Sequence, residues 1–570
     1  MVTADMPLPR VPAAVQSVQI NHCKNPLCLN FGLPASLNDM RGRKAEDRDQ
    51  YRITGGRSSS VSLTCLICEQ SSVVKSNQAV VEERDRLFVA SGLVEVLQCP
   101  NESCGQLALR DENVSRLFSS NGATPSGTPR LRCKACRTTF TPGVRQRTQR
   151  RPELDELIFR LLVNKMPMRR ICETADIPAS TLYSKITFIF NQSRTFAANM
   201  ERSLLMGSHR PARLYVSTDK QDYIFNWGTQ LDRRNIMLTA IGSVDNASGY
   251  VLAMHLNFDP EQDPEVIETA AKAAGDYERD APFRRYARLW LQRDYLSRRG
   301  NLATEDPDIL PPLNTKRPSV GMQVRSDYSM LGHFFFLGEL CAGTEKLRFF
   351  LDRDPGMQTA CAAAFVERIK EGSVDVFTVT LGKSMTIDDK KRAKAKAEQR
   401  VRKFLEAHPG LDAWQVKAQI VRQEIEAHYH AKDLHCTWLS YPFPDMGEPE
   451  KAIRMVTDAQ RYDLDHLARL YTKVSLQGVD KFFMLVRRRL SIFERPIHTA
   501  NNANRTWHGY SGYNPAIGAQ LLCLFRVFYN YALLGEDKAT PAMRLGLAER
   551  PYTLREILDA NSPSLLASKP

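Results

Sequence analysis

The fold is decided by residues 213–227, RLYVSTDKQDYIFNW, together with residues 233–259, RRNIMLTAIGSVDNASGYVLAMHLNFD. Apolar residues alternate in these stretches and then run together, which is typical of β-strands with one or both faces buried. The segment DNASG at 245–249 has the composition of a tight turn between two strands. The pattern predicts three successive antiparallel strands, with Asp219 late in the first.

The chain downstream alternates between helical and extended patterns. A helical, Pro-rich stretch leads to HFFFLGELCAG at 333–343, which is followed by the strand pattern LRFFLD at 347–352. The small-residue helix pattern QTACAAAFVERI at 358–369 and a further strand pattern, VDVFTVTL at 374–381, come next. The order of three strands, helix, strand, helix, strand predicts an α/β core around a mixed sheet.

Length and charge set the broad class of the protein. The 570 residues leave room for about three to five domains. Lys and Arg number 78 against 64 Asp and Glu, a net charge of +14 that predicts a polyanionic partner. Asp5, Pro7 and Arg10 interrupt the N-terminus where a signal peptide needs an apolar core, and no run is apolar enough to span a membrane. We therefore expect a soluble, intracellular protein with no membrane partner.

Cysteine pairs repeat a spacing in the first quarter of the chain. A pair with a four-residue spacer, CKNPLC or CPNESC, is followed each time by a pair with a two-residue spacer, CLIC or CKAC. Such pairs suit tetrahedral zinc, and small ribbons of this kind need the metal to fold. We expect two structural Zn²⁺ sites, formed in chain order by Cys23, Cys28, Cys65 and Cys68, and by Cys99, Cys104, Cys133 and Cys136.

A basic segment follows the last cysteine pair and leads into two helical patterns. The sequence MRRICETADIPASTLYSKITFIF at 168–190 predicts a short helix, a break at 176–178 and a second helix, which is the pattern of a helix-turn-helix. A helical hairpin within a core is the alternative interpretation. The DNA-binding interpretation assigns phosphate or groove contacts to Arg145, Arg147, Arg150, Arg151, Arg169, Arg170, Ser180, Thr181, Tyr183 and Lys185.

The order of strands and acidic residues resembles the DDE/DDD transposase and retroviral integrase superfamily, over roughly residues 205–535. The cysteine pairs and the helix-turn-helix pattern are similar to the front end of bacterial insertion-sequence transposases. The resemblance implies an RNase H-like fold, three carboxylates that hold two Mg²⁺ or Mn²⁺ ions, and cleavage and joining of DNA strands. It also implies double-stranded transposon ends and target DNA as partners, a homodimer or larger synaptic oligomer, and a cytoplasmic, nucleoid-associated location.

The resemblance implies three acidic positions, two of which stay open. Asp219 fits the first, with Asp222 as fallback. The second is Asp352 at a strand end or Asp354 in a D-x-G arrangement with Gly356; we favour Asp354, although both acids could simply cap the next helix.

For the third position we favour Asp480 in VDKFFMLVRRRL over Glu494 in SIFERP. The favoured motif is similar to the family's Glu-x-Phe-Phe helix, with Asp in place of Glu. Arg487 and Arg488 on the same helix, and Trp507 in a loop-like segment, are then candidate DNA contacts.

The predicted organisation is a multi-domain α/β protein. Two rival functions are a non-catalytic DNA-binding regulator with a decayed RNase H-like domain, and a nuclease without strand transfer. The predicted regions are a first zinc ribbon at 1–75, a second zinc ribbon at 76–147, a helix-turn-helix domain at 148–204, an RNase H-like core at 205–385, a helical insertion at 386–475, C-terminal helices of the core at 476–535, and a tail at 536–570.

Overall fold

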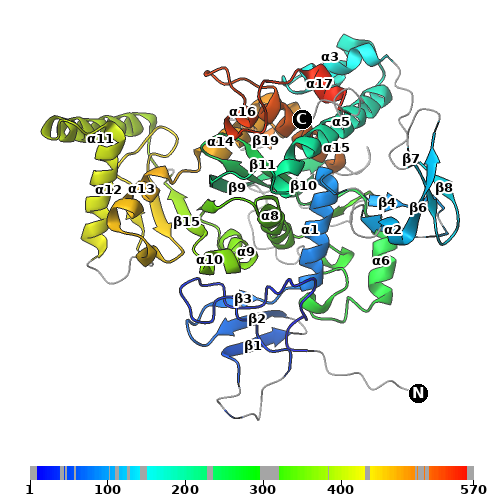
Figure 1. The fold of residues 1–570 in the computed structure, drawn as a ribbon, viewed down its shortest axis with the longest axis horizontal. Coiled ribbons are helices and arrows are strands. Elements are labelled where there is room, and N and C mark those ends of the chain that lie inside the picture. The colour runs from blue at the N-terminus through cyan, green and yellow to red at the C-terminus, as the bar shows by residue number, and fades with distance from the viewer. Residues whose placement is uncertain are drawn as a thin grey trace.

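The computed structural model gives a mixed α/β protein (Figure 1). No helix in the described part of the chain is both long and apolar enough to cross a membrane. The described residues are 9–38, 44, 48–56, 59–94, 96–101, 103–104, 106–109, 114–124, 129–141, 151–226, 235–295, 320–382, 384–429, 437–494, 497–498, 506–507 and 512–560.

A mixed sheet forms the centre of the molecule, and the predicted order of strands is confirmed. The first three strands are antiparallel neighbours, β9 (Arg213–Asn226), β10 (Asn235–Asp245) and β11 (Val251–Leu256). The next two, β14 (Lys346–Asp352) and β15 (Val374–Leu381), run parallel to β9 on its other side. The sheet order is β11-β10-β9-β14-β15-β17-β16, and β20 (Gly512–Tyr513) also pairs with β9.

Helices cover both faces of this sheet. Gly242 on β10 faces Phe483 of α14 (Gln477–Arg489), while its neighbour Ser243 hydrogen-bonds to His333 of α8 (Ser326–Leu340). Because consecutive strand residues point to opposite faces, α8 and α14 lie on opposite sides of the sheet. The helices α9 (Pro355–Ala364), α10 (Val366–Lys370) and α15 (Pro515–Tyr531) also contact strands of this sheet. The same region contains α6 (Pro264–Ala273) and a separate two-stranded sheet of β12 (Phe258–Asp259) and β13 (Met322–Gln323).

The segment predicted as a helical insertion only partly has that character. Its helices α11 (Ile387–Ala407) and α12 (Ala413–Tyr429) extend to one side in Figure 1. However, β16 (Leu439–Ser440) and β17 (Lys451–Met455) continue the main sheet next to β15, and α13 (Leu464–Lys473) follows them. The strand KAIRM is short, with every second residue buried, so its pattern is weak in a charged, helical context.

The predicted tail is a second difference. The helices α16 (Pro541–Leu545) and α17 (Leu554–Leu558) lie within it, and α17 packs against α3 and α5. Ile557 is fully buried and Leu558 nearly so. Residues 536–560 therefore belong to the folded body, because these apolar side chains gain burial against the α3–α5 helices.

Two small cysteine-containing regions precede the central sheet. The first module carries the sheet β1 (Tyr51–Gly56), β2 (Ser59–Cys65) and β3 (Ser71–Val73), and α1 (Asn77–Ser91) runs from it onto α8. The second module comprises β4 (Val96–Gln98), β5 (Leu107–Leu109), α2 (Val114–Leu117), β6 (Phe118–Ala123), β7 (Pro129–Cys133) and β8 (Thr139–Phe140). Three helices then lead into β9: α3 (Asp155–Leu162), α4 (Met168–Ala175) and α5 (Ala179–Leu205).

Candidate active site, DNA-facing residues and metal clusters

A cleft of about 800 Å³ lies beside the middle of β9, where β14 and β15 end and α14 begins. Three acidic side chains named from the sequence, Asp219, Asp352 and Asp480, line this one cleft. They come from three elements that are far apart in the chain. The other lining residues are Lys220, Gln221, Asp222, Arg353, Thr380, Leu381, Gly382, Lys390, Gly447, Pro449, Leu476, Phe483 and Arg487.

Strand register brings the first two acids together. The parallel pairing of β9 with β14 ends at Thr218 opposite Leu351. Asp219 and Asp352 are the next residues on the two strands, so they follow at adjacent positions. Apolar strand residues before them are fully buried, which fixes this register. The pairing of Asp219, in the middle of β9, with Asp352, at the end of β14, therefore follows from the burial pattern of the two strands.

Close packing of α14 on the sheet supplies the third acid. The backbone N–H of Val479 donates to Ser217 Oγ at 3.1 Å, two residues before Asp219. A Cβ on Gly478 would lie 2.2 Å from Asn246 Oδ1, so only glycine permits this approach. Gly242 of β10 pairs with Asp219 of β9, and the ring of Phe483 packs against Gly242. These contacts set the first turn of α14, which carries Asp480, at the edge of the cleft.

The cleft acids repel one another. Burial and the negative charge of Asp352, followed by that of Asp480, raise the pKa of Asp219 from 3.8 to about 7. The backbone N–H of Lys220, which donates to Asp219 Oδ1 at 2.7 Å, offsets part of this rise. A carboxylate that is buried beside like charges is stabilised by a cation. Hard divalent ions such as Mg²⁺ prefer such oxygen ligands.

The other acids named from the sequence have different partners. Asp354 caps α9 by accepting the backbone N–H of Met357 at 3.0 Å, and its carboxylate lies 2.5 Å from Lys220 Nζ. Burial alone would raise the pKa of Asp354, but the hydrogen bonds from Lys220 and Met357 outweigh it and keep that pKa below its ordinary value. Glu494 pairs with Lys165 at 2.8 Å and does not line the cleft. Asp222 lines the cleft but accepts the hydroxyl of Thr239 at 2.6 Å.

Basic side chains surround the acids. Arg487 lies two helical turns after Asp480 and lines the same cleft, while Arg488 is exposed. The sequence analysis missed Lys220, Arg353 and Lys390. The first two directly follow Asp219 and Asp352, a signal that was available. Lys390 begins α11, and only the folded arrangement brings it to the cleft.

The candidate DNA-binding residues outside the cleft differ in their exposure and in their partners. Helices α4 and α5 meet at a tight turn in which Asp176 adopts a left-handed backbone with φ 48°. Ser180, Tyr183, Arg169 and Arg170 are exposed and Thr181 is half-buried; both arginines pair with Glu173. Arg151 is exposed and donates to the carbonyl of Asp176. Arg145, Arg147, Arg150 and the side chain of Trp507 lie outside the described residues.

Lys185 requires a correction. Its side chain is only 1% exposed, and its Nζ lies 2.5 Å from Asp155 Oδ1 of α3. It sits on the face of α5 that also carries the buried residues Leu182, Ile186 and Ile189. Lys185 is therefore an internal ion-pair partner that joins α5 to α3, and it cannot face a DNA groove.

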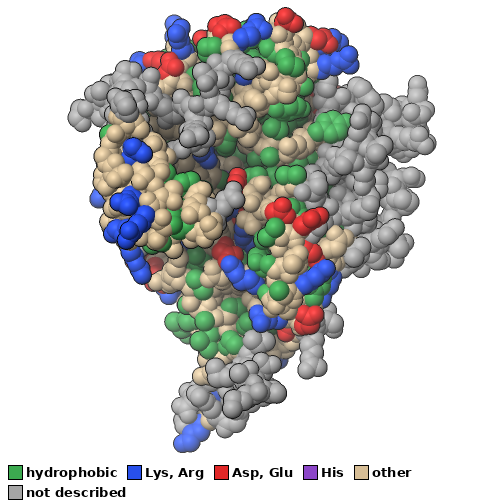
Figure 2. Space-filling model, turned by 90° about the vertical axis from the view of Figure 1, so that its right-hand side faces the viewer, with side chains coloured by type: hydrophobic (Ala, Val, Ile, Leu, Met, Phe, Trp, Pro, Cys, Tyr) green, Lys and Arg blue, Asp and Glu red, His purple; other side chains and the backbone are tan. Residues whose placement is uncertain are grey.

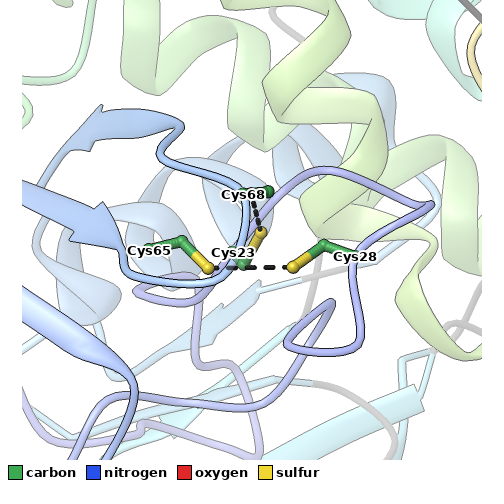
Figure 3. Close-up of side chains that lie close together, drawn as sticks. All are labelled: Cys23, Cys28, Cys65 and Cys68. Atoms are coloured by element: carbon green, nitrogen blue, oxygen red, sulfur yellow. Dashed lines mark hydrogen bonds between the residues drawn. The ribbon is translucent and has the colours of Figure 1, made fainter.

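The eight N-terminal cysteines form the two predicted quartets. In each quartet all four sulfur atoms lie within 4.8 Å of one another. In the first, Cys23 Sγ is 3.5 Å from Cys68 Sγ and Cys28 Sγ is 3.7 Å from Cys65 Sγ, and Figure 3 shows the sulfurs converging. In the second, the pairs Cys99–Cys136 and Cys104–Cys133 are 3.3 and 3.7 Å apart.

This geometry suits zinc. A tetrahedron with Zn–S bonds of about 2.3 Å has S–S edges of roughly 3.8 Å, whereas a disulfide bond is about 2.05 Å long. Burial raises the pKa of Cys65, but backbone N–H groups of Cys68 and Ile67 outweigh it and lower that pKa to about 7. The turn thus favours the thiolate form that binds a metal. Both cysteine clusters are compatible with structural Zn²⁺.

Comparison with known proteins adds no family. No model of a known protein family matches the chain, and no curated protein matches it.

Proposed function

We propose that the protein is a transposase of the DDD type, which cleaves and joins DNA strands with the help of two divalent metal ions. The observation that carries this proposal is the convergence of Asp219, Asp352 and Asp480 on one cleft. The strand order, with three antiparallel strands followed by two strands parallel to the first, supports an RNase H-like core.

The residues present fit a divalent-ion site. The raised pKa of Asp219, caused by burial and by the charges of Asp352 and Asp480, is relieved when a cation is bound between these carboxylates. The three aspartates would hold the ions. The chemistry that such ions supply is activation of a water or 3′ hydroxyl and stabilisation of the leaving oxygen.

The remaining lining residues suit a nucleic acid strand. Lys220 is held by Asp354 at the cleft edge, and Arg487 approaches from α14. Cations in these positions neutralise phosphates on either side of the scissile bond. Exposed Arg169, Arg170, Ser180 and Tyr183 support DNA binding by the α4–α5 pair. A synaptic dimer or larger oligomer is part of the proposal, because two transposon ends must be held together.

The test uses purified protein and duplex DNA from both ends of the genetic element that carries its gene. With Mg²⁺, joined DNA products are expected from the wild type, and Asp219→Asn and Asp480→Asn should abolish them while retaining DNA binding. Cleavage without joining would establish a nuclease. Tight binding without cleavage by the wild type would replace the proposal with a non-catalytic regulator.

A further inference from the structure

The two cysteine modules share a cysteine spacing but differ in how they attach to the body. Val18, Ile20 and Phe31 of the first module belong to the same buried core as the central sheet. Gly32 packs closely on Val366 of α10: a Cβ added to Gly32 would lie 2.2 Å from the Val366 side chain. Cys23, Cys28 and Cys65 lie in a separate small cluster of the first module. The second module has a similar small core, formed by Leu97, Cys99, Phe118 and Cys133, but none of its described buried residues belongs to the central core.

Their charges also differ. In the first module Arg10 pairs with Asp49, and Lys75 pairs with Asp327 of α8. The segment 114–152, which contains most of the second module, has nine Lys or Arg and neither Asp nor Glu. Five of these cations lie in the described part of the module, are exposed and form no ion pair with other described residues: Arg116, Arg130, Arg132, Lys134 and Arg137. Two cations of the first module are thus paired with acids, whereas these five cations of the second module form no ion pair with described residues.

The second module presents two of its cations on the outward face of strand β7. Cys133 of β7 is fully buried, so the alternate residues Arg130 and Arg132 point outward. Arg132 is flanked by Ser119 of β6 and Thr139 of β8, and Asn121 hydrogen-bonds to Thr139 at 3.2 Å. Figure 2 turns this side of the molecule to the viewer, and Lys and Arg side chains gather along one edge of it.

We propose that the β6–β7–β8 surface of the second module binds the phosphate backbone of duplex DNA, while the first module serves as a structural brace without DNA contact. Guanidinium groups flanked by hydroxyl and amide donors are the usual partners of phosphate oxygens. The choice of duplex DNA rests on the proposed function. The surface contacts the backbone, so it adds affinity without sequence preference.

The experiment measures binding of the full chain to a duplex of about 30 base pairs of random sequence, by fluorescence anisotropy from about 50 to 200 mM salt. Arg130→Gln combined with Arg132→Gln is expected to lower affinity about tenfold near 100 mM salt and to reduce the salt slope by about two. The matched control removes two exposed cations of the first module, Arg48→Gln combined with Arg52→Gln, and should leave both values unchanged.

Each variant must still contain two zinc ions per chain, which shows that its modules are folded. Arg116→Gln combined with Arg137→Gln is a second variant of the same module. The inference would be overturned if the substitutions in the two modules lowered DNA affinity equally, or if those in the second module did not lower it. It would also be overturned if the second-module substitutions lowered affinity only for an RNA duplex of the same length. Mg²⁺-dependent cleavage by the wild type is measured in parallel, so failure of this surface is distinguishable from failure of the catalytic proposal.

Discussion

The cysteine clusters and the aspartate cleft are two candidate metal sites with opposite electrostatics. The four sulfurs of each cysteine cluster lie within 4.8 Å of one another in buried or half-buried surroundings. The cleft instead brings together carboxylates, and burial together with their mutual repulsion raises the pKa of Asp219 to about 7. A cysteine cluster needs a metal to hold a small module together, whereas a carboxylate cleft is held by the sheet and is destabilised by its own charge.

Under the proposed function, this difference separates structural metal sites from a catalytic one. Removal of the structural metal should cost stability. Removal of a cleft carboxylate should cost activity and increase stability, which is common where a site is built for function rather than for folding.

Loss of zinc is the largest expected effect and sharpens the contrast between the two clusters. Structural zinc contributes on the order of 10 kcal/mol of apparent binding free energy in small modules. Cys65→Ser should lower the main unfolding temperature, because Val18, Ile20 and Phe31 connect the first module to the central core, although Cys65 itself lies in the module's own cluster. Cys133→Ser should release one zinc per chain and leave the main transition in place. Zinc analysis and calorimetry check this; equal shifts of the main transition in both variants would contradict it.

Asp219→Asn should stabilise the protein at pH 8, which is the opposite of a cysteine substitution. Because the folded-state pKa of Asp219, about 7, exceeds its ordinary value of 3.8, its ionisation costs folding free energy. That cost grows as the pH rises from about 4 to about 7 and is complete above that. The gain in the variant should reach up to about 4 kcal/mol at pH 8 and shrink toward pH 4.

Urea unfolding in magnesium-free buffer at several pH values measures this gain. Added Mg²⁺ should then stabilise the wild type more than the variant, because the variant has lost a ligand. A variant that is less stable than the wild type at pH 8 would show that Asp219 is held by favourable contacts instead.

A smaller effect separates the two neighbouring acids of β14 and α9. Asp354→Ala removes an N-cap and an ion pair with Lys220, and should lower the free energy of unfolding by about 1 kcal/mol. Asp352→Ala removes charge from the cleft and should leave stability equal or higher in magnesium-free buffer. Denaturant titrations of both variants at pH 8 measure this difference. If Asp352→Ala were less stable than Asp354→Ala, the assignment of Asp352 to the cleft and of Asp354 to the helix cap would be wrong.

The smallest effect is expected at Glu494. Its carboxylate is partly exposed and pairs with Lys165. Exposed pairs of this kind contribute roughly 0.5 kcal/mol or less. Glu494→Gln should therefore change the free energy of unfolding by no more than this amount. It should leave Mg²⁺-dependent activity unchanged. A loss of activity as large as that of Asp480→Asn would move the third carboxylate to Glu494.

Local patterns were enough to predict the cysteine clusters and the central strands β9, β10, β11, β14 and β15. Cysteine spacing is short-range information, and the apolar runs of β9, β14 and β15 carry their own periodicity. The burial of Lys185 was missed because its partner Asp155 lies on another helix, 30 residues away. The segments 451–455 and 554–558 were misassigned for a similar reason: their burial depends on neighbours that are distant in the sequence.

The choice between Asp352 and Asp354 also depends on tertiary structure. Both acids follow the same apolar strand, and the local pattern D-R-D-P-G favours either. Strand register places Asp352 beside Asp219, while Lys220 and the first turn of α9 engage Asp354. Neither Lys220 nor the register can be read from the residues around position 352 alone.

The most direct test of the account compares Mg²⁺-dependent strand cleavage by Asp352→Asn and Asp354→Asn on end-sequence DNA, with binding measured in parallel. The account predicts that Asp352→Asn loses at least about a thousandfold in cleavage rate and that Asp354→Asn stays within about tenfold of the wild type, both with normal DNA binding. Loss of cleavage in Asp354→Asn with full activity in Asp352→Asn would contradict the assignment of the cleft as the active site.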